Sequence, residues 1–135
     1  MLDFESVAPA LVALLDPLKP LGIVARTPAN LPQSTGQPND AVASIVVLLE
    51  DVTPIDRGNI HGPWARRYQI GYQCRAAQLF GEAGLYRLPV HLDRLVNNQA
   101  VAGLGVLRFE RFTVTSRARE YWEGLVVFSA VRFDP

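Results

Sequence analysis

The sequence contains little of the material from which disulfides, metal sites and basic nucleic-acid-binding surfaces are built. Its 135 residues include one cysteine, Cys74, and two histidines. A single cysteine excludes a disulfide or a thiolate metal cage within one chain. Lysine plus arginine number 13 and aspartate plus glutamate also number 13, so the formal net charge is zero. A neutral chain argues against bulk affinity for nucleic acid.

Signals for secretion and membrane insertion are also missing. The N-terminal Met1, Leu2 and Asp3 precede an apolar stretch without any basic residue, and Asp16 and Pro17 interrupt that stretch. A membrane span needs about 20 apolar residues, so we expect neither a signal peptide nor an anchor. With 49% hydrophobic and 19% charged residues, the chain can build one core. Residues 1–135 are predicted to form a single domain.

The N-terminal segment has helical periodicity. Residues 4–16 are predicted to form an amphipathic helix, because apolar side chains recur at steps of three and four. Either Asp3 or Ser6 can cap this helix, and Pro9 favours Ser6, since proline is tolerated in a first turn. Pro17 should end it.

Strands and loops are expected to alternate in the middle of the chain. Residues 21–25 predict a short strand, and residues 26–40, with three prolines and many Asn and Gln, predict a loop. Residues 43–52 are a β-branched run with apolar residues on both faces, which is typical of an interior strand. A second loop is expected over 53–63.

Residues 64–80 predict an unusually long strand. Tyr68, Tyr72 and Cys74 share one face, whereas the alternate positions are half polar. Seventeen extended residues would span about 56 Å, although a domain of this size has a radius of gyration near ~14 Å. The strand must therefore bend or protrude, and Gly71 is the natural position for a bulge.

The C-terminal part predicts a helix followed by a hairpin. Residues 83–96 have helical spacing, with Pro89 either in the first turn of a helix that starts near Leu88 or at a kink. Residues 106–115 and 121–133 are expected to pair antiparallel. The order α-β-β-β-α-β-β is typical of an α+β domain with two helices on one face of a mostly antiparallel sheet of about five strands.

Catalytic and cofactor-binding patterns are weak. Glu50, Asp51 and Asp56 cluster as the acids of a metal-dependent nuclease do, but no lysine lies near them in sequence, and they can equally solvate the end of a strand. His61 and His91 form no recognised metal motif. Cys74 lies on the apolar face of its strand, which favours an inert thiol. No cofactor and no catalytic residue is therefore predicted, and His91 is expected on the flank of its helix.

Arginine and aromatic residues suggest a contact surface instead. Arginines near the second loop and in the last hairpin can contact phosphates, although neighbouring acids offset their charge, so solvated or interfacial arginines are the simpler interpretation. The candidate interface with a subunit or partner comprises Arg57, His61, Trp64, Arg66, Arg67, Tyr68, Arg117 and Arg119.

The whole layout resembles the tail terminator, or tail completion, proteins of long-tailed phages. The likeness includes the N-terminal helix, the long Pro/Asn loop before a β-branched strand, and the strand RRYQIGYQCRAA. It continues through the helix from Gly84 to Leu95 and ends with the strand WEGLVVFSAVRF.

This resemblance implies a structural role without catalysis. Such proteins form a hexameric ring of identical copies at the head-proximal end of the tail tube, end its polymerisation and join the tail to the neck. The implied partners are the chain itself, the tail tube protein and a neck or connector protein. Genomic DNA passes through the lumen without specific binding, and the implied location is the virion tail after assembly in the host cytoplasm. A neck or head-tail connector protein of similar fold and a small metal-dependent nuclease remain the alternatives.

Overall fold

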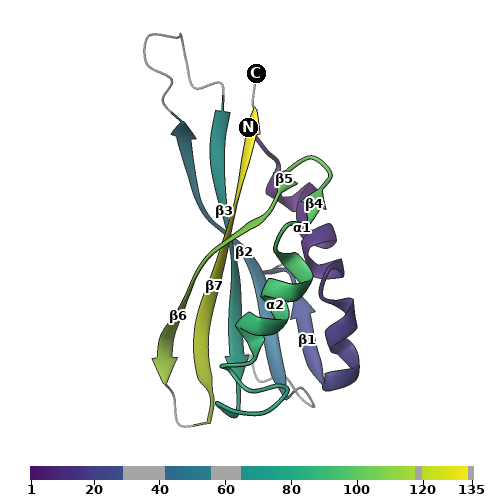
Figure 1. Cartoon of the computed structure of the whole chain (residues 1–135), viewed down its shortest axis with the longest axis vertical. Helices are drawn as coiled ribbons and strands as arrows, with labels where there is room; N and C mark the ends of the chain where they lie inside the picture. The colour runs from purple at the N-terminus through teal and green to yellow at the C-terminus, as the bar shows by residue number, and fades with distance from the viewer. Residues whose placement is uncertain (29–41, 56–64, 118–119, 134–135) are drawn as a thin grey trace.

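A five-stranded sheet carries the helices on one face, in a computed structural model that describes residues 1–28, 42–55, 65–117 and 120–133 (Figure 1). The strand order is β1-β2-β3-β7-β6, with β1 parallel to β2 and every other neighbour antiparallel. The elements are α1 (Phe4–Ala13), the 3₁₀ helix η1 (Asp16–Leu21), β1 (Ile23–Arg26), β2 (Ala43–Ile55), β3 (Ala65–Ala76), α2 (Leu88–Val96), β4 (Ala100–Val101), β5 (Gly105–Val106), β6 (Arg108–Arg117) and β7 (Trp122–Phe133). The predicted α+β class and order are confirmed, and the small β4–β5 hairpin is an addition.

The first helix begins at Phe4, as predicted, but ends at Ala13 rather than at residue 16. Asp3 is the cap, since its carboxylate accepts a hydrogen bond from the Glu5 amide at 3.2 Å, and Pro9 therefore lies inside the helix. After Ala13 the Leu15 amide donates to the Val12 carbonyl at 2.9 Å instead of to Leu11, and Pro17 has no N–H with which to continue an α-helix. The chain tightens into η1, which ends at Gly22 with a φ of 81°, a backbone conformation that favours glycine.

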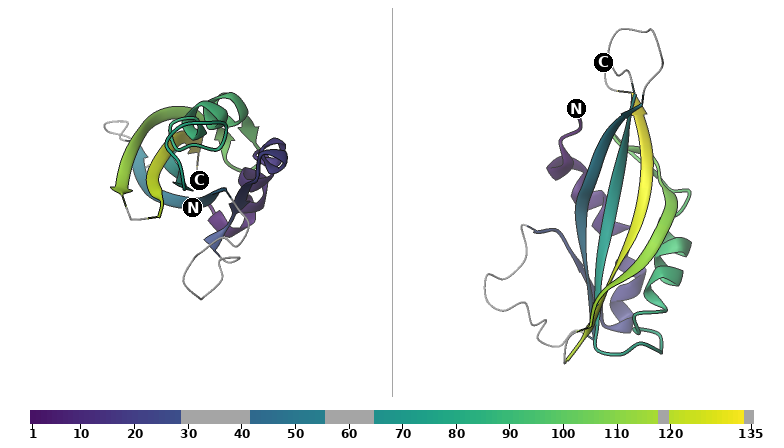
Figure 2. Two further views of the ribbon diagram at one scale, coloured as in Figure 1. Left: turned by 90° about the horizontal axis from the view of Figure 1, so that it is seen from below. Right: turned by 90° about the vertical axis from the view of Figure 1, so that its left-hand side faces the viewer.

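The predicted boundaries of the central strands needed correction. β2 continues to Ile55, so residues 53–55 belong to the strand rather than to a loop, and residues 56–63 lie outside the described ranges. Most of the other predicted loop, residues 29–40, also lies outside them. β3 ends at Ala76 rather than at residue 80, because the Gln78 and Leu79 carbonyls accept hydrogen bonds from Leu85 and Tyr86 instead of from a strand. The long strands curve together (Figure 2).

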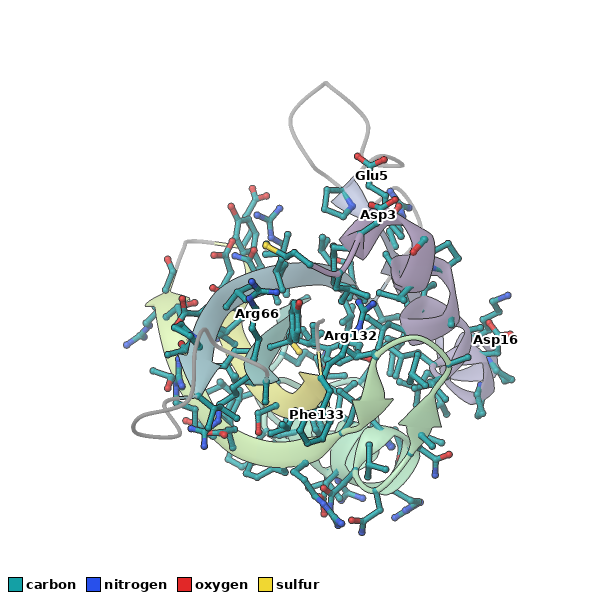
Figure 3. The ribbon with its side chains drawn as sticks, turned by 90° about the horizontal axis from the view of Figure 1, so that it is seen from above. Asp3, Glu5, Asp16, Arg66, Arg132 and Phe133 are labelled. Carbon is teal, nitrogen blue, oxygen red and sulfur yellow. The ribbon has the colours of Figure 1, made fainter. Side chains whose placement is uncertain are left out.

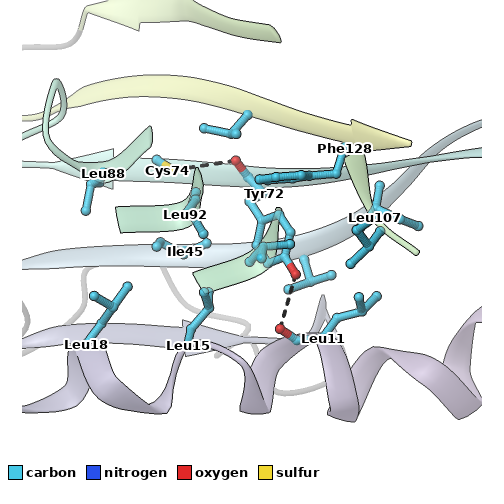
Figure 4. Packing of buried hydrophobic residues seen from close by; sticks show 14 of the residues in the cluster. Leu11, Leu15, Leu18, Ile45, Tyr72, Cys74, Leu88, Leu92, Leu107 and Phe128 are labelled. Atoms are coloured by element: carbon cyan, nitrogen blue, oxygen red, sulfur yellow. Dashed lines mark hydrogen bonds between the residues drawn. The ribbon is translucent and has the colours of Figure 1, made fainter. Parts of the chain in front are cut away.

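The inner face of the sheet, defined here as the face covered by α1, η1 and α2, holds the core. Tyr68, Tyr72 and Cys74 of β3 are completely buried on it, as their alternation predicts. Leucines from all three helices join the same cluster. Tyr72 lies at the centre of this packing (Figure 4), where its ring meets Phe128 edge-on at 5.7 Å and its hydroxyl donates to the Leu11 carbonyl at 3.2 Å.

The second helix starts at Leu88, with Pro89 in its first turn. The alternative in which the helix starts near Leu88 is therefore confirmed. A proline there removes no intrahelical hydrogen bond, since the first amides of a helix have no partner within it. The helix ends at Val96 with Asn97 as its C-cap, and the following Asn98 has a positive φ of 67°.

The opposite, outer face of the sheet has no helix among the described residues packed on it. In the right-hand view of Figure 2 the strands lie in front of both helices. A β-bulge between Leu49 and Asp51 leaves Glu50 without a partner position on β3. A Cβ atom on Gly71 would lie 2.6 Å from the Glu50 Cγ, so Gly71 leaves the space that the Glu50 side chain occupies. The bulge predicted near Gly71 of β3 therefore lies at Glu50 of the neighbouring strand β2.

We expect this close contact to appear as an energetic coupling. Gly71→Ala should lower the free energy of unfolding by about 1 kcal/mol, because the new methyl group displaces the Glu50 side chain. In a Glu50→Ala background the loss should shrink by roughly 0.5–1 kcal/mol. Urea unfolding of the wild type, both single variants and the double variant measures the coupling. Equal losses in both backgrounds would contradict the contact.

Candidate subunit interface

The described arginines of the predicted interface lie at opposite ends of the sheet. Arg66 and Arg67 are near the start of β3. Arg117 is the last residue of β6 and lies opposite Trp122 of β7, which in turn lies opposite Ala76 of β3. At 3.3 Å per residue, the two groups are about 33 Å apart along the strands. They form no single patch.

Tyr68 corrects the interface prediction. Its side chain is fully buried, and its hydroxyl accepts a hydrogen bond from the Leu2 amide at 3.0 Å. Tyr68 lies on the inner face of β3, which α1 covers, and its hydrogen bond with Leu2 holds the start of the chain in place. Tyr68 is therefore a core residue, and no partner can reach its ring without unfolding this region.

The start of β3 forms a basic end of the sheet. Arg66 is half-buried and lies directly opposite Arg132 of β7, and Figure 3 shows both at this end with Phe133. Arg67 is exposed on the outer face. It lines a surface pocket of about 260 Å³ with Thr53, Pro54, Ile55 and Gln69. Polar and cationic groups thus surround this end of β2 and β3.

The remaining predicted interface residues lie outside the described ranges. They are Arg57, His61, Trp64 and Arg119. Their part of the prediction stays a prediction.

The other end of the sheet is held by arginine contacts within the chain. Arg75 donates to Glu123 Oε1 through Nη2 at 2.7 Å, and its guanidinium carbon lies 4.2 Å from the centre of the Tyr121 ring. Arg117 stacks over Trp122, with 4.6 Å between the guanidinium carbon and the ring centre. These contacts join β3, β7 and β6. The sequence did not single out Arg75, because only the strand register shows that it lies opposite Glu123.

The described acidic residues of the predicted cluster, Glu50 and Asp51, each have a contact of their own within the chain. Glu50 covers Gly71, and Asp51 accepts a hydrogen bond from the Thr53 hydroxyl at 3.0 Å. Asp56 lies outside the described ranges. Within residues 1–28, 42–55, 65–117 and 120–133, no group of three or more His, Cys, Asp or Glu side chains is placed to hold a metal ion.

His91 of α2 is buried, with 7% of its surface exposed. Its Nε2 lies 2.8 Å from the Glu82 carbonyl oxygen and 3.6 Å from the Glu82 carboxylate. These contacts tie the loop before α2 to the helix. His91 is buried because the loop before α2 folds over that side of the helix.

Neither sequence comparison supplies a relative. No protein-family model matches the chain, and no curated protein matches it significantly. None of the helices in the described part of the chain is long and apolar enough to cross a membrane.

The edges of the sheet offer backbone groups that no described segment pairs. β1 pairs with β2 only from Ala43 to Val46, so β2 has a neighbour on one side alone from Val47 to Ile55. At the opposite edge, β6 pairs with β7 only. Nine of the ten β6 residues are exposed, including Phe109 at 41% and Val114 at 43%. Such edges favour association with another strand.

Cys74 is not a reactive group. Its thiol is completely buried, with Sγ 3.5 Å from the Tyr72 carbonyl oxygen, and burial raises its pKa far above the ordinary value. Because the pKa is raised, the group stays a neutral thiol as the pH rises through the range where an exposed cysteine ionises. The predicted inert thiol is confirmed.

Thiol labelling tests this environment. Between pH 7 and 9, a disulfide reagent should react with the folded chain at least about 100-fold more slowly than with the chain in urea, because only opened molecules expose the sulfur. The unfolded chain provides the control, with an ordinary rise of rate with pH. Rapid labelling of the folded chain that follows an ordinary thiol pKa would contradict the buried position.

Proposed function

We propose that this chain is a structural virion protein that forms a ring at the head-proximal end of the tail tube of a long-tailed phage. In this role it ends tube polymerisation and joins the tail to the neck. The succession of α1, β1 to β3, α2, β6 and β7 supports the proposal, because it is the layout on which the resemblance to tail terminator proteins depends.

The observation that carries the proposal is the pair of unpaired edges. The outward edge of β6 and the end of β2 lie on opposite sides of one sheet (Figure 2). Identical copies placed side by side can use both edges at once, with one edge of each copy facing the other edge of its neighbour. A contact between two different surfaces of the same chain repeats around an axis and closes into a ring when the rotation allows it.

The position of the core is compatible with this arrangement. The helices bury the inner face within each copy, so the edges can be used without opening the core. An exposed aromatic pair, Phe80 with Tyr86, lies in the loop before α2, with ring centres 5.7 Å apart and 75% of Phe80 exposed. An apolar group of this kind suits a contact with the tube or the neck. The zero net charge suits DNA that passes without being held.

Mass measurement in solution, combined with electron microscopy of the protein mixed with tail tubes, tests the proposal. We expect a species of six copies, or rings that form at tube ends, and tubes that stop elongating. Complete tails, whose head-proximal ends are already occupied, are the control and should bind little protein. A chain that stays monomeric and ignores tube ends would overturn the proposal.

Two further outcomes would favour the alternatives. Capture by the isolated connector but not by tube ends would assign the chain to the neck. Cleavage of DNA with magnesium or manganese, abolished by Glu50→Gln with Asp51→Asn, would instead support the nuclease.

A further inference from the structure

The two unpaired edges have defined lengths. On β2 the stretch from Val47 to Ile55 is unpaired on the side away from β3 among the described residues. On β6 the Asn97 side chain accepts a hydrogen bond from the Phe109 amide at 2.9 Å, so the unpaired stretch begins after Phe109 and continues to Arg117. At 3.3 Å per residue each stretch spans about 25–30 Å. The two edges are therefore matched in length.

The direction of the strands fits pairing between copies of the same orientation. β2 is antiparallel to β3, β3 to β7, and β7 to β6, so β6 runs opposite to β2. If a second copy stands beside the first with the same end up, its β6 lies antiparallel to β2 of the first. Antiparallel pairs form the slightly more stable ladder. The registers place the unpaired part of β2 beside β3 residues 65–72 and the unpaired part of β6 at the level of β3 residues 71–76, so the two stretches are staggered along the sheet. Copies related by a rotation axis keep the same end up, and the two stretches meet when the strands are tilted to that axis.

The charges along the two edges have opposite sign. β2 presents the exposed carboxylates of Glu50 and Asp51 in its unpaired stretch. β6 presents Arg111 and Arg117 against a single acid, Glu110. Two β2 edges would bring carboxylates together, and two β6 edges would bring arginines together. Like charges across strands are destabilising, whereas β2 against β6 pairs opposite charges.

From these three observations we infer that β6 of one copy adds to the unpaired part of β2 of the next, so that the sheets of neighbouring copies become continuous. The occupant of each edge is a second copy of this chain. Backbone hydrogen bonds supply the contact, and the acids of β2 and the arginines of β6 select the correct edge and suppress pairing of like edges. This inference rests on the proposed ring and identifies the contact that builds it.

Charge reversal with exchange of partners tests the inference. One variant carries Glu50→Lys with Asp51→Lys, and the other carries Arg111→Glu with Thr113→Glu, both at exposed positions away from the core. Each variant alone should associate at least about tenfold more weakly than the wild type at low salt, because two or more charges now repel at each contact. Mixing the two should restore part of the association, since the lysine edge of one meets the glutamate edge of the other. A chain with all four changes should associate nearly as the wild type does.

Arg94→Glu is the matched control. Arg94 is exposed on α2 and lies on neither edge, so its reversal changes the net charge without changing association. Far-ultraviolet circular dichroism and urea unfolding show whether each variant remains folded. The recovery on mixing also separates loss of contact from loss of fold, because an unfolded variant is not rescued by a partner.

The outcomes distinguish the inference from the proposed function. Wild-type protein that forms rings or caps tubes, with both charge variants doing so equally well or with no recovery on mixing, would overturn the edge pairing and leave the ring intact. Wild-type protein that stays monomeric both at high concentration and with tubes would overturn the ring and the edge pairing together. Loss in each variant, recovery on mixing and no effect of Arg94→Glu would support both.

Discussion

The contact between Tyr72 and the helical layer is the constraint on which the rest of the structure depends. Tyr72 is completely buried, yet its hydroxyl reaches the Leu11 carbonyl, so a polar group at the centre of the core is satisfied. Burial raises the pKa of this phenol far above its ordinary value, and it stays a neutral donor. Since the same ring packs edge-on against Phe128, one side chain joins α1, β3 and β7. Its position fixes which face of the sheet the helices cover.

The exposed parts of the sheet follow from this one-sided core. The helices stabilise the inner face, and the order and lengths of the strands leave the edges unpaired among the described residues. β1 has four residues and β2 has thirteen, so β1 cannot cover its neighbour. The chain enters β6 from the β4–β5 hairpin, just after Leu107, whose carbonyl accepts a hydrogen bond from the Asn98 amide at 2.8 Å, and the rest of β6 stays at the edge. A chain that fills its core internally but leaves two long edges with opposite charges is suited to contact copies of itself.

Sequence periodicity predicted the buried elements well because burial itself creates the pattern. Tyr68, Tyr72 and Cys74 alternate because one face of β3 is covered, and backbone chemistry limited Pro89 to a first turn or a kink, of which the first is observed. The sequence left Asp3 and Ser6 open as helix caps, and only the preference for Ser6 was wrong, because the choice depends on which carboxylate or hydroxyl reaches an amide in three dimensions.

The candidate interface was less predictable than the fold, because it depends on strand register. Tyr68 was assigned to a contact surface on residue type, although its hydroxyl is used by Leu2 inside the molecule. Arg75 and Glu123 are far apart in sequence, so no local sequence pattern predicts their hydrogen bond. The sequence predicted an overlong strand at residues 64–80. The backbone groups that no described strand pairs belong instead to β2 and β6.

Amide hydrogen exchange of the isolated chain and of the assembled ring measures the central claim most directly. The claim is that a finished core leaves two strand edges for identical neighbours to complete. Amides of β3 and β7, which have strands on both sides, should exchange slowly in both states. About every second amide within residues 47–53 and 110–117, those that point away from β3 and β7, should exchange quickly in the isolated chain and become protected on assembly. Assembly that leaves these two stretches unprotected, and protects other surfaces instead, would contradict the account.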